Sequence, residues 1–509
     1  MSDLADLLSQ LNASLSDHIG LLPMLLLTIL ALLLLPLSQV RSFQRGLGVF
    51  ALLGLGVATA LVYEMFAFPH LGFGTFERRL DESYFGGAMV VNAWSLFFSA
   101  IFLVVALLVC LASLSEVKRH EPHQGEYYAL LLLATVGMLV VASANDLFLL
   151  FIGIEIASVS TFALTAWRKK DALSSEAAIK FFLIGGLSAA LLLYGISWVY
   201  GATGSVQLGQ IAAAAPHTTH PEALTLGALL MIAGFGFKFA AVPFHGWAPD
   251  VYTGAPTTIS AFLAAGSKKM AVVAALKVFV IGFGTVAATV HWQLIFGVLA
   301  ILTMTVGNVV ALWQTDIKRM LAYSSIGQAG YILIAVAVAT PDAIAAGLYH
   351  SLTHALMKGG AFLLVGGLAA AGVGYKIADW EGLGRRSPGM ALAATLLLLG
   401  LAGIPPTGGF FSKFFIFATA VAAGDWFLWL AVIGLLNSAL SLYYYAKVIR
   451  AIYKRPAKAG AKHVHVPLPY AAAVILATIG VLATFFFANL GFGLASEAAE
   501  SLLTLTSLR

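Results

Sequence analysis

One apolar run of the sequence contains the segment Gly234-Phe-Gly236-Phe-Lys238-Phe-Ala-Ala-Val-Pro243. A second run contains Gly403-Ile-Pro405-Pro406-Thr-Gly408-Gly409-Phe-Phe-Ser-Lys413. Proline removes a backbone donor and glycine loosens a helix, so each segment predicts an interrupted helix that carries a lysine. Unpaired backbone at membrane depth is tolerated only where it is buried in protein or lines water. Two such breaks in one chain are typical of inverted repeats with an ion site at each break.

The composition places these breaks in an integral membrane protein. Of the 509 residues, 60% are hydrophobic and 10% are charged, and the mean hydropathy is +0.94. Soluble domains have about 25% charged residues, so the soluble, secreted, disordered and nucleic-acid-binding classes are excluded. The single cysteine, Cys110, excludes a disulfide framework, an iron–sulfur cluster and a cysteine zinc site. Because Asp3, Asp6 and Asp17 stand where a signal peptide needs positive charge, we expect no cleavable signal.

Apolar runs long enough to cross a membrane repeat along the chain. A crossing helix needs about 20 apolar residues, and we predict 14 spans, at 19–37, 46–68, 88–113, 127–144, 146–167, 174–200, 223–242, 256–283, 290–312, 322–339, 342–373, 389–421, 424–446 and 467–490. The fourth to eighth and the ninth to thirteenth form two five-span units, in which the two broken spans correspond.

We therefore predict an all-α integral membrane protein with about 14 transmembrane helices, two inverted five-helix repeats and two broken helices. Its parts would be an N-terminal three-helix segment (1–120), a first half (121–285), a second half (286–450), and a cytoplasmic loop with the last helix (451–509).

Lysine and arginine residues in the loops predict the orientation. Of 28 such residues, 18 fall in one set of alternating loops and 3 in the other. The positive-inside rule puts the larger set in the cytoplasm and both termini outside. The larger set comprises Arg41, Arg45, Lys118, Arg119, Arg168, Lys169, Lys170, Lys318, Arg319, Lys376, Arg385, Arg386, Lys447, Arg450, Lys454, Arg455, Lys458 and Lys462; the smaller comprises Arg78, Arg79 and Arg509.

The remaining seven basic residues are lysines within the predicted spans, namely Lys180, Lys238, Lys268, Lys269, Lys277, Lys358 and Lys413. A charge at mid-bilayer costs about 2.5–3.5 kcal/mol, so these lysines would face a hydrated protein interior. Arginine stays protonated on burial, whereas buried lysine can release its proton near neutral pH, which favours proton transfer. Snorkelling to the interface is the alternative for Lys269 and Lys277. Lys268 and Lys269 point about 100° apart on a helix and cannot share one role.

Two acids and two histidines join these lysines in the spans. Glu64 lies near the end of its run, where interfacial placement explains it, whereas Glu155 lies well inside its run on a short stem. The i, i+4, i+8 spacing of His350, His354 and Lys358 puts them on one helix face, which indicates a proton relay. A metal site is the alternative, but it needs a further carboxylate or histidine for which we find no candidate.

The glycine-rich segments are not nucleotide-binding loops. They lack a preceding strand and any Walker or dinucleotide spacing, and we find no nucleophile elbow, redox motif or soluble domain. We therefore expect no cofactor and no metal in this chain, and the residues alone favour a transporter.

Several motifs resemble the antiporter-like subunits of respiratory complex I. The segment Pro243-Phe-His-Gly-Trp-Ala-Pro-Asp250-Val-Tyr-Thr-Gly254-Ala-Pro256, followed by Ser267-Lys268, is similar to their seventh-to-eighth-helix region, and its Asp250-to-Pro256 form is similar to the subunit N branch. Further similar segments are Leu150-Phe-Ile-Gly-Ile-Glu155, Glu176-Ala-Ala-Ile-Lys180, Asp316-Ile-Lys-Arg-Met-Leu-Ala-Tyr-Ser-Ser-Ile326-Gly327 and Gly403 to Lys413. The resemblance covers most of the chain, from about residue 90 to 450.

The resemblance implies a hydrophilic axis through the membrane. Glu155 would pair with Lys238 and tune its pKa, and Lys180 would lie between a neighbouring subunit and that pair. Lys268 would connect two half-channels, and Lys413 would be the site of the second half. The expected proton-transfer residues are Glu155, Lys180, Lys238, Lys268, His354, Lys358 and Lys413.

The resemblance also implies a function, that of a membrane-arm subunit of a proton-translocating NADH:quinone oxidoreductase in a prokaryotic plasma membrane. Its partners would be other membrane-arm subunits and lipid, with no nucleic acid. Quinone and NADH, or another reduced donor, would be used by the assembled complex and not by this chain, which would hold no redox centre.

One departure leaves alternatives open. His354-Ala-Leu-Met-Lys358 resembles subunits L and M and the antiporters, and bacterial subunit N often lacks this pair. The chain could therefore belong to an archaeal relative that uses a reduced deazaflavin or ferredoxin, or to a multisubunit sodium/proton antiporter.

Overall fold

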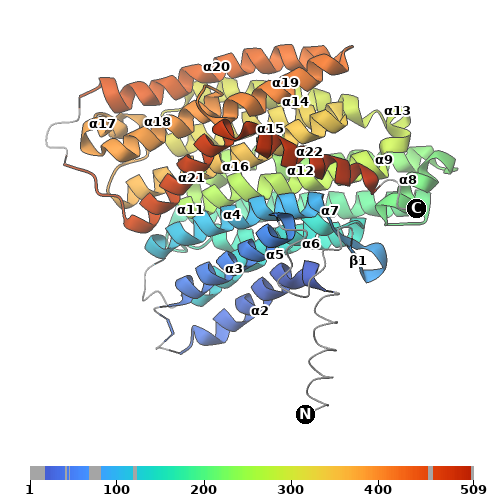
Figure 1. Ribbon diagram of the computed structural model, residues 1–509, viewed down its shortest axis with the longest axis horizontal. Coiled ribbons are helices and arrows are strands. Elements are labelled where there is room, and N and C mark those ends of the chain that lie inside the picture. Colours follow the sequence, from blue (N-terminus) through green and yellow to red (C-terminus); the bar gives the residue numbers. More distant parts are fainter. Residues whose placement is uncertain are drawn as a thin grey trace.

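The chain folds into a bundle of long helices that lie roughly along the longest axis of the molecule (Figure 1). The computed structural model describes residues 18–40, 43–44, 46–67, 82–117, 123–456 and 462–505. Within these ranges, 13 helices are long and apolar enough to cross a membrane. They are α2 (Leu22–Leu37, preceded by η1, Ile19–Leu21), α3 (Leu47–Ala67), α4 (Ala93–Glu116), α5 (Gln124–Ser143), α6 (Leu147–Thr165), α7 (Ala172–Thr203), α9 (Pro221–Phe239), the rod α11–η4–α12–η5 (Thr257–Phe262, Leu263–Ser267, Lys268–Leu276, Lys277–Gly282), α14 (Trp292–Trp313), α15 (Ile317–Val338), α16 (Pro341–Ala370), α20 (Phe427–Lys454) and α21 (Leu468–Phe486).

Both predicted breaks are present. The twelfth span is divided between α18 (Pro388–Ala402) and α19 (Gly408–Ala423), each shorter than a membrane crossing requires. Counted as one broken helix, they complete the predicted set of 14. At the other break, α9 ends directly after Lys238 and the chain continues into the short helix α10 (Trp247–Gly254). Cis peptide bonds join Val242 to Pro243 and Pro405 to Pro406.

The two five-helix repeats follow one another along the chain. The first comprises α5, α6, α7, α9 with α10, and the rod from α11 to η5; the second comprises α14, α15, α16, α18 with α19, and α20. The helices α2 and α3 (blue in Figure 1) cover the flank formed by α4 and α5. The last two helices, α21 and α22 (Ala488–Thr504), both pack against α16 and α4. The predicted fold class is therefore confirmed.

Polar residues at the predicted boundaries start several helices. Asp146 accepts hydrogen bonds from the backbone N–H groups of Phe148 and Leu149, at 2.8 and 3.0 Å, and so caps α6. Asp171 and Asp316 cap α7 and α15 in the same way. The closest pair of predicted spans is thus separated by a capped turn between α5 and α6.

The helices α7 and α9 touch through glycines. A Cβ atom added at Gly195 would lie 2.8 Å from the carbonyl oxygen of Gly227, and one added at Gly227 would lie 2.9 Å from that of Gly195. Neither distance leaves room for a side chain, so the two backbones are in contact, as small residues permit between membrane helices. This contact fixes the helix that carries Lys238.

The short elements lie near the ends of the bundle. They are β1 (Glu82–Tyr84) paired antiparallel with β2 (Met89–Val91), η2 (Phe85–Gly87), α8 (Leu208–Ala214), η3 (Ala215–His217), η6 (Gly284–Val286), α13 (Ala287–Val290), η7 (Ile377–Trp380) and α17 (Leu383–Arg386). Loops of the predicted cytoplasmic set meet at one end, where Arg455 pairs with Glu381 at 2.7 Å and Lys447 donates to the carbonyl of Gln314 at 3.3 Å. Arg41, Arg45, Arg78, Arg79, Lys118, Arg119, Lys458 and Arg509, and also Asp3, Asp6 and Asp17, lie outside the described residues.

Several helix boundaries differ from the prediction, and one helix was not predicted. The helix α20 continues from the predicted end at 446 to Lys454, so Lys447 and Arg450 lie on helix turns and not in a loop. This extension is amphipathic and buries Val448 and Ile452, which keeps it helical beyond its apolar run. The helix α22 was not predicted, because its apolar face alternates with acidic residues and gives no continuous apolar run.

Candidate functional site

Lys238 lies in the last turn of α9 and is buried. Its Nζ donates to Oγ of Ser158 on α6 at 2.5 Å, and Ser158 in turn donates to the carbonyl of Ile154. The rings of Phe162 and Phe237 flank the ammonium group, with centroids 5.9 and 5.4 Å from Nζ. The lysine is thus held by a hydroxyl group and two aromatic faces.

Glu155 lies one helical turn before Ser158 on α6 and is half-buried. Its Oε1 has no hydrogen-bond partner in the part of the chain that the structure describes. Glu155 and Lys238 interact electrostatically, but no ion pair within 4.0 Å joins them. Ser158 holds the lysine in place of the direct pair implied by the resemblance.

Lys180 lies on α7 and points to a different set of partners. Its Nζ is 2.7 Å from Oδ2 of Asp250 on α10 and 2.7 Å from Oε1 of Glu176. Nη1 of Arg319 on α15 is 2.9 Å from Oδ1 of the same aspartate. Partial burial raises the pKa of Asp250, but the hydrogen bonds from the two cations outweigh it and leave that pKa below its usual value. Asp250 therefore joins three helices as a carboxylate.

Lys318 anchors the same short helix. It lies beside Arg319 at the start of α15, and its Nζ donates to the carbonyls of Thr253 and Ala255, both at 2.9 Å. These carbonyls end α10, where a cation also complements the helix dipole. The sequence counted Lys318 and Arg319 only as loop charges, but Lys318 is buried and both residues fix α10 to the second repeat.

Three lysines follow one another along the rod from α11 to η5. Lys268 donates to the carbonyl of Ser325 on α15 at 2.9 Å. Lys269 lies 2.5 Å from Nδ1 of His354 on α16 and also donates to the carbonyl of Ala264 at 2.9 Å. As predicted for adjacent helical residues, the two side chains have different partners.

Lys277 begins the π-helical segment η5. Its Nζ donates to the carbonyls of Ala142 and Ala144, at 2.6 and 2.7 Å, and so caps the end of α5. Lys277 and Lys269 are both fully buried. Snorkelling to an interface is therefore wrong for both of them.

The predicted stripe on α16 lies at the centre of the bundle. The rings of His350 and His354 are stacked, with centroids 5.9 Å apart. Nδ1 of His350 is 2.9 Å from Oγ of Ser412 on α19. Lys358 donates to Oγ of Ser324 at 2.6 Å, and that hydroxyl also bonds to Tyr445. The Nε2 atoms of both histidines have no hydrogen-bond partner within the described ranges.

Lys413 bridges the break in the second repeat. From α19, its Nζ donates to the carbonyls of Leu401 and Ala402 at the end of α18, at 3.0 and 3.1 Å, and to Oγ of Ser438 at 2.9 Å. The ring of Tyr331 lies 4.9 Å from Nζ. Lys413 thus follows its break and satisfies the carbonyls exposed there, whereas Lys238 precedes its own.

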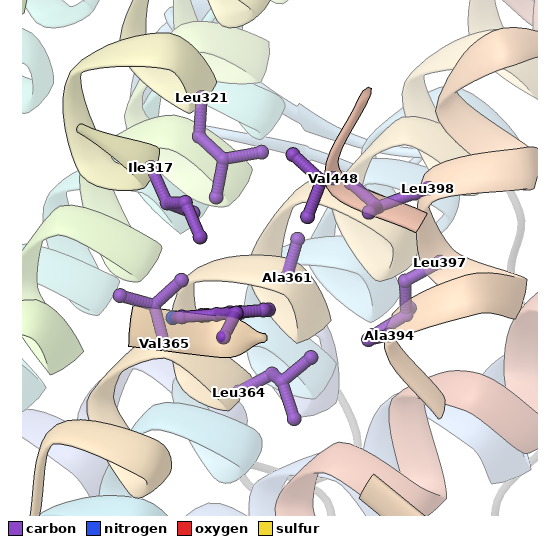
Figure 2. A pocket seen from close by; sticks show the side chains of 10 residues that line it. Ile317, Leu321, Ala361, Leu364, Val365, Ala394, Leu397, Leu398 and Val448 are labelled. Atoms are coloured by element: carbon purple, nitrogen blue, oxygen red, sulfur yellow. The ribbon is translucent and has the colours of Figure 1, made fainter. Parts of the chain in front are cut away.

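The other candidates lie away from this line. Glu64 is partly exposed near the end of α3. Among the residues with described positions, no group of three or more His, Cys, Asp and Glu side chains could hold a metal ion. A small pocket between α15, α16 and α18 has an aliphatic and aromatic lining (Figure 2). Leu321 lines it, while the carbonyl of the same residue accepts from Lys358 at 3.3 Å. The pocket offers no site for a charged ligand.

The residues brought together define the class of protein. Buried amines and imidazoles lie in both repeats, from Lys238 in the first to Lys413 in the second, and Lys269 of the first repeat contacts His354 of the second. Sequence reasoning missed the serines that bond to these groups, Ser158, Ser324 and Ser412, because isolated serines in apolar runs carry no signal of their own. Such a line of titratable groups inside a polytopic bundle is typical of an ion-translocating membrane subunit.

Comparisons with known proteins agree with this class. Residues 144–441 match the family described as NADH:quinone oxidoreductase/Mrp antiporter, TM. F(420)H(2) dehydrogenase subunit N of Methanosarcina mazei is 46% identical over 472 residues, which cover 90% of this chain and 93% of that protein. NADH-quinone oxidoreductase subunit N of Trichlorobacter lovleyi is 38% identical, with coverage of 91% and 93%.

A solved structure shows the same fold. A chain of respiratory complex I from Thermus thermophilus, solved with bound aureothin, matches 93% of this chain and 99% of its own length. The TM-score is 0.76 and the identity is 32%. The chain therefore belongs to the NADH:quinone oxidoreductase/Mrp antiporter transmembrane family. The resemblance to the antiporter-like subunits, and to subunit N among them, is confirmed.

Proposed function

We propose that the chain translocates protons as the N-type membrane-arm subunit of a donor:quinone oxidoreductase. The observation that carries the proposal is the set of buried amines and imidazoles on the two broken helices and on the rod and α16. Relatives named subunit N align over about 90% of the chain, which supports a place among other membrane-arm subunits. Electron transfer would occur in other subunits, and no redox centre would lie in this chain.

The charges of Glu155 and Lys238 explain how electron transfer in other subunits could drive the movement of a proton through this chain. The carboxylate of Glu155 stabilises the ammonium form of Lys238, so withdrawing that negative charge favours release of the proton. The proton would then cross the rod that carries Lys268 and Lys269, pass His354 and Lys358, and leave by way of Lys413. Lys180 would transmit the state of a neighbouring subunit to this pair, through Asp250 in the arrangement described. Moving one charge against 100 mV requires about 2.3 kcal/mol.

Replacing Lys238 tests the function. In the assembled complex, in inverted membrane vesicles, Lys238→Met should reduce proton uptake per electron about tenfold or more, because methionine removes the amine that takes up and releases the proton. The amounts of the other subunits that co-purify would show that the complex assembles. A Lys238→Met complex that assembles and pumps as the unmodified complex does would refute the proposal.

The electron donor is open to a direct experiment. The 46% identity to F(420)H(2) dehydrogenase subunit N, against 38% to the NADH-quinone oxidoreductase relative, favours reduced deazaflavin as an alternative to NADH. The complex purified gently from its native membrane should reduce quinone with one of these donors. Exchange of sodium for protons without any donor would instead indicate a multisubunit antiporter.

We further propose a prokaryotic plasma membrane as the location, with both termini on the outer side. The larger set of loop lysines and arginines supports this orientation. The division at residues 120, 285 and 450 stays a proposal as well. The boundary at 285 lies between η5, which ends at Gly282, and α14, which begins at Trp292, whereas the boundary at 450 falls inside α20.

A further inference from the structure

We propose that Lys269, and not its neighbour Lys268, passes the proton from the first repeat to the second, by way of His354. The inference rests on the proton translocation proposed above. It concerns a buried contact at which an amine of the first repeat touches an imidazole of the second, with 2.5 Å between Nζ and Nδ1.

The partners of the three rod lysines separate their roles. The ammonium of Lys268 donates to a backbone carbonyl, and that of Lys277 donates to two. A backbone carbonyl can hold an ammonium group but cannot take up its proton and pass it on. Lys269 has such a carbonyl partner too, but it also contacts an imidazole nitrogen, which can accept a proton. Among these three lysines, a transfer partner is present only at Lys269.

The contact continues into the second repeat without leaving the buried interior. The ring of His354 stacks on that of His350, with 18° between the ring planes. His350 reaches Ser412 at 2.9 Å, and Ser412 precedes Lys413 in α19. His350 also interacts electrostatically with both Lys269 and Lys413. The two histidines therefore lie between the rod and the second broken helix.

Local geometry selects Lys269 for this contact. The π-helical segment η4 ends at Ser267, and its wider turn rotates the residues that follow relative to an uninterrupted α-helix. On the facing helix, a Cβ atom added at Gly359 would lie only 3.2 Å from the Cβ of Ala265 in η4. The glycine lets α16 approach η4 closely, one turn beyond His354, so that a direct amine–imidazole contact forms.

The proton balance of the step is simple. The N–H bond of the Lys269 ammonium breaks, its electron pair stays on Nζ, and the proton binds the lone pair of Nδ1 of His354. The imidazolium then releases the proton from Nε2 and becomes neutral again. A water molecule between the two rings would carry that proton to Nε2 of His350. A proton released from Nδ1 of His350 passes to Ser412 and on towards Lys413.

Arginine substitutions test this step. Lys269→Arg keeps a buried cation and donor but cannot release a proton, so proton uptake per electron in vesicles with the assembled complex should fall about tenfold or more. His354→Gln supplies an acceptor oxygen for Lys269 but no proton carrier, and should have the same effect. The matched control is Lys277→Arg, whose side chain is equally buried but has only carbonyl partners, and it should pump as the unmodified complex does.

The outcomes separate this inference from the proposed function. Normal pumping in an assembled Lys269→Arg complex would overturn the inference. It would also be overturned if Lys268→Arg lost pumping while Lys269→Arg kept it. If Lys269→Arg prevents assembly, His354→Gln decides in its place, and normal pumping there would overturn the inference. Loss of pumping in Lys238→Met together with normal pumping in His354→Gln would leave the proposed function standing without this step. Normal pumping in Lys238→Met, Lys269→Arg and His354→Gln would overturn both the proposed function and this inference.

Discussion

At the scale of single residues, the interior holds its lysines with neutral acceptors. Lys238 donates to a serine, Lys268 to a carbonyl, and Lys413 to a serine and two carbonyls. Such partners stabilise the ammonium group without fixing its charge, since none of them carries a counter-charge. The exception lies at the end of the bundle, where Asp250 binds two cations directly.

Replacing Asp250 should reveal its structural role. Asp250→Asn should lower the free energy of unfolding by on the order of 1–2 kcal/mol, since partly exposed ion pairs contribute about 0–1 kcal/mol each. Because its pKa is lowered in the folded state, this contribution is complete above about pH 3.9 and is lost as pH falls through the lowered value. Thermal inactivation of the assembled complex should therefore show a constant deficit from pH 5 to pH 8.

The control for this prediction is Glu176→Gln, which removes the more exposed partner of Lys180 and should change stability little. Equal stability of Asp250→Asn and the unmodified complex at pH 7 would contradict the structural role of the ion pairs that Asp250 forms with Lys180 and Arg319.

The sequence predicted the site residues better than their partners. Charge in an apolar run is conspicuous, so both histidines and six of the seven buried lysines were identified in advance. The seventh, Lys318, was counted as a loop charge. The partners are serines and carbonyls, which occur throughout such runs, and they become visible only when the helices pack. For the same reason Lys269 was treated as a residue that could snorkel, although it is the one that touches His354.

At the scale of helices, backbone contact between glycines sets the spacing of the bundle. On α7, Gly195 faces the carbonyl of Gly227, whereas Gly186 and Gly201 on the same helix have nothing within 4 Å of an added Cβ. The hydropathy of the chain predicted that α7 crosses the membrane, but it could not distinguish these glycines, because contact between helices depends on three-dimensional packing.

Valine substitutions should distinguish them. Gly195→Val would force α7 away from α9 at an energetic cost of about 1–3 kcal/mol, the usual range for overpacking. We expect a lower yield of assembled complex and a lower midpoint of thermal inactivation. Gly186→Val and Gly201→Val change the same residue type on the same helix, and they should assemble normally. An equal loss of assembly in all three variants would show that helix flexibility, and not the contact with α9, is what matters.

At the scale of the whole molecule, the lengths of the apolar runs and the two glycine- and proline-rich breaks were sufficient to predict the number of membrane-spanning helices. Fourteen apolar runs and two breaks predicted the spans that the described residues contain, as 13 long helices and the broken pair α18 and α19. The helix α22 was not predicted, because an amphipathic helix is recognised only together with the surface that its apolar face covers. In this chain α16 and α4 form that surface.

The orientation can be measured with single cysteines. Cys110 is fully buried, so it should not react with a membrane-impermeant thiol reagent. A cysteine at Lys170 should react only from the cytoplasmic side, and one at Thr219 only from the outer side, because both positions are exposed in loops of opposite predicted sets. Labelling of both from one side would contradict the orientation.

The anchoring of α10 on α15 has a mechanical consequence. The first turn of α15 binds α10 through Lys318 and Arg319, and the next turn carries Ser324 and Ser325, whose oxygens hold Lys358 and Lys268. Because hydrogen bonds weaken steeply with distance, a shift of α15 by about 1 Å would loosen both lysines together. The helix α15 therefore connects α10 to buried amines of both repeats. A displacement of α10 that moves α15 would change the hydrogen bonds of Lys268 and Lys358 together.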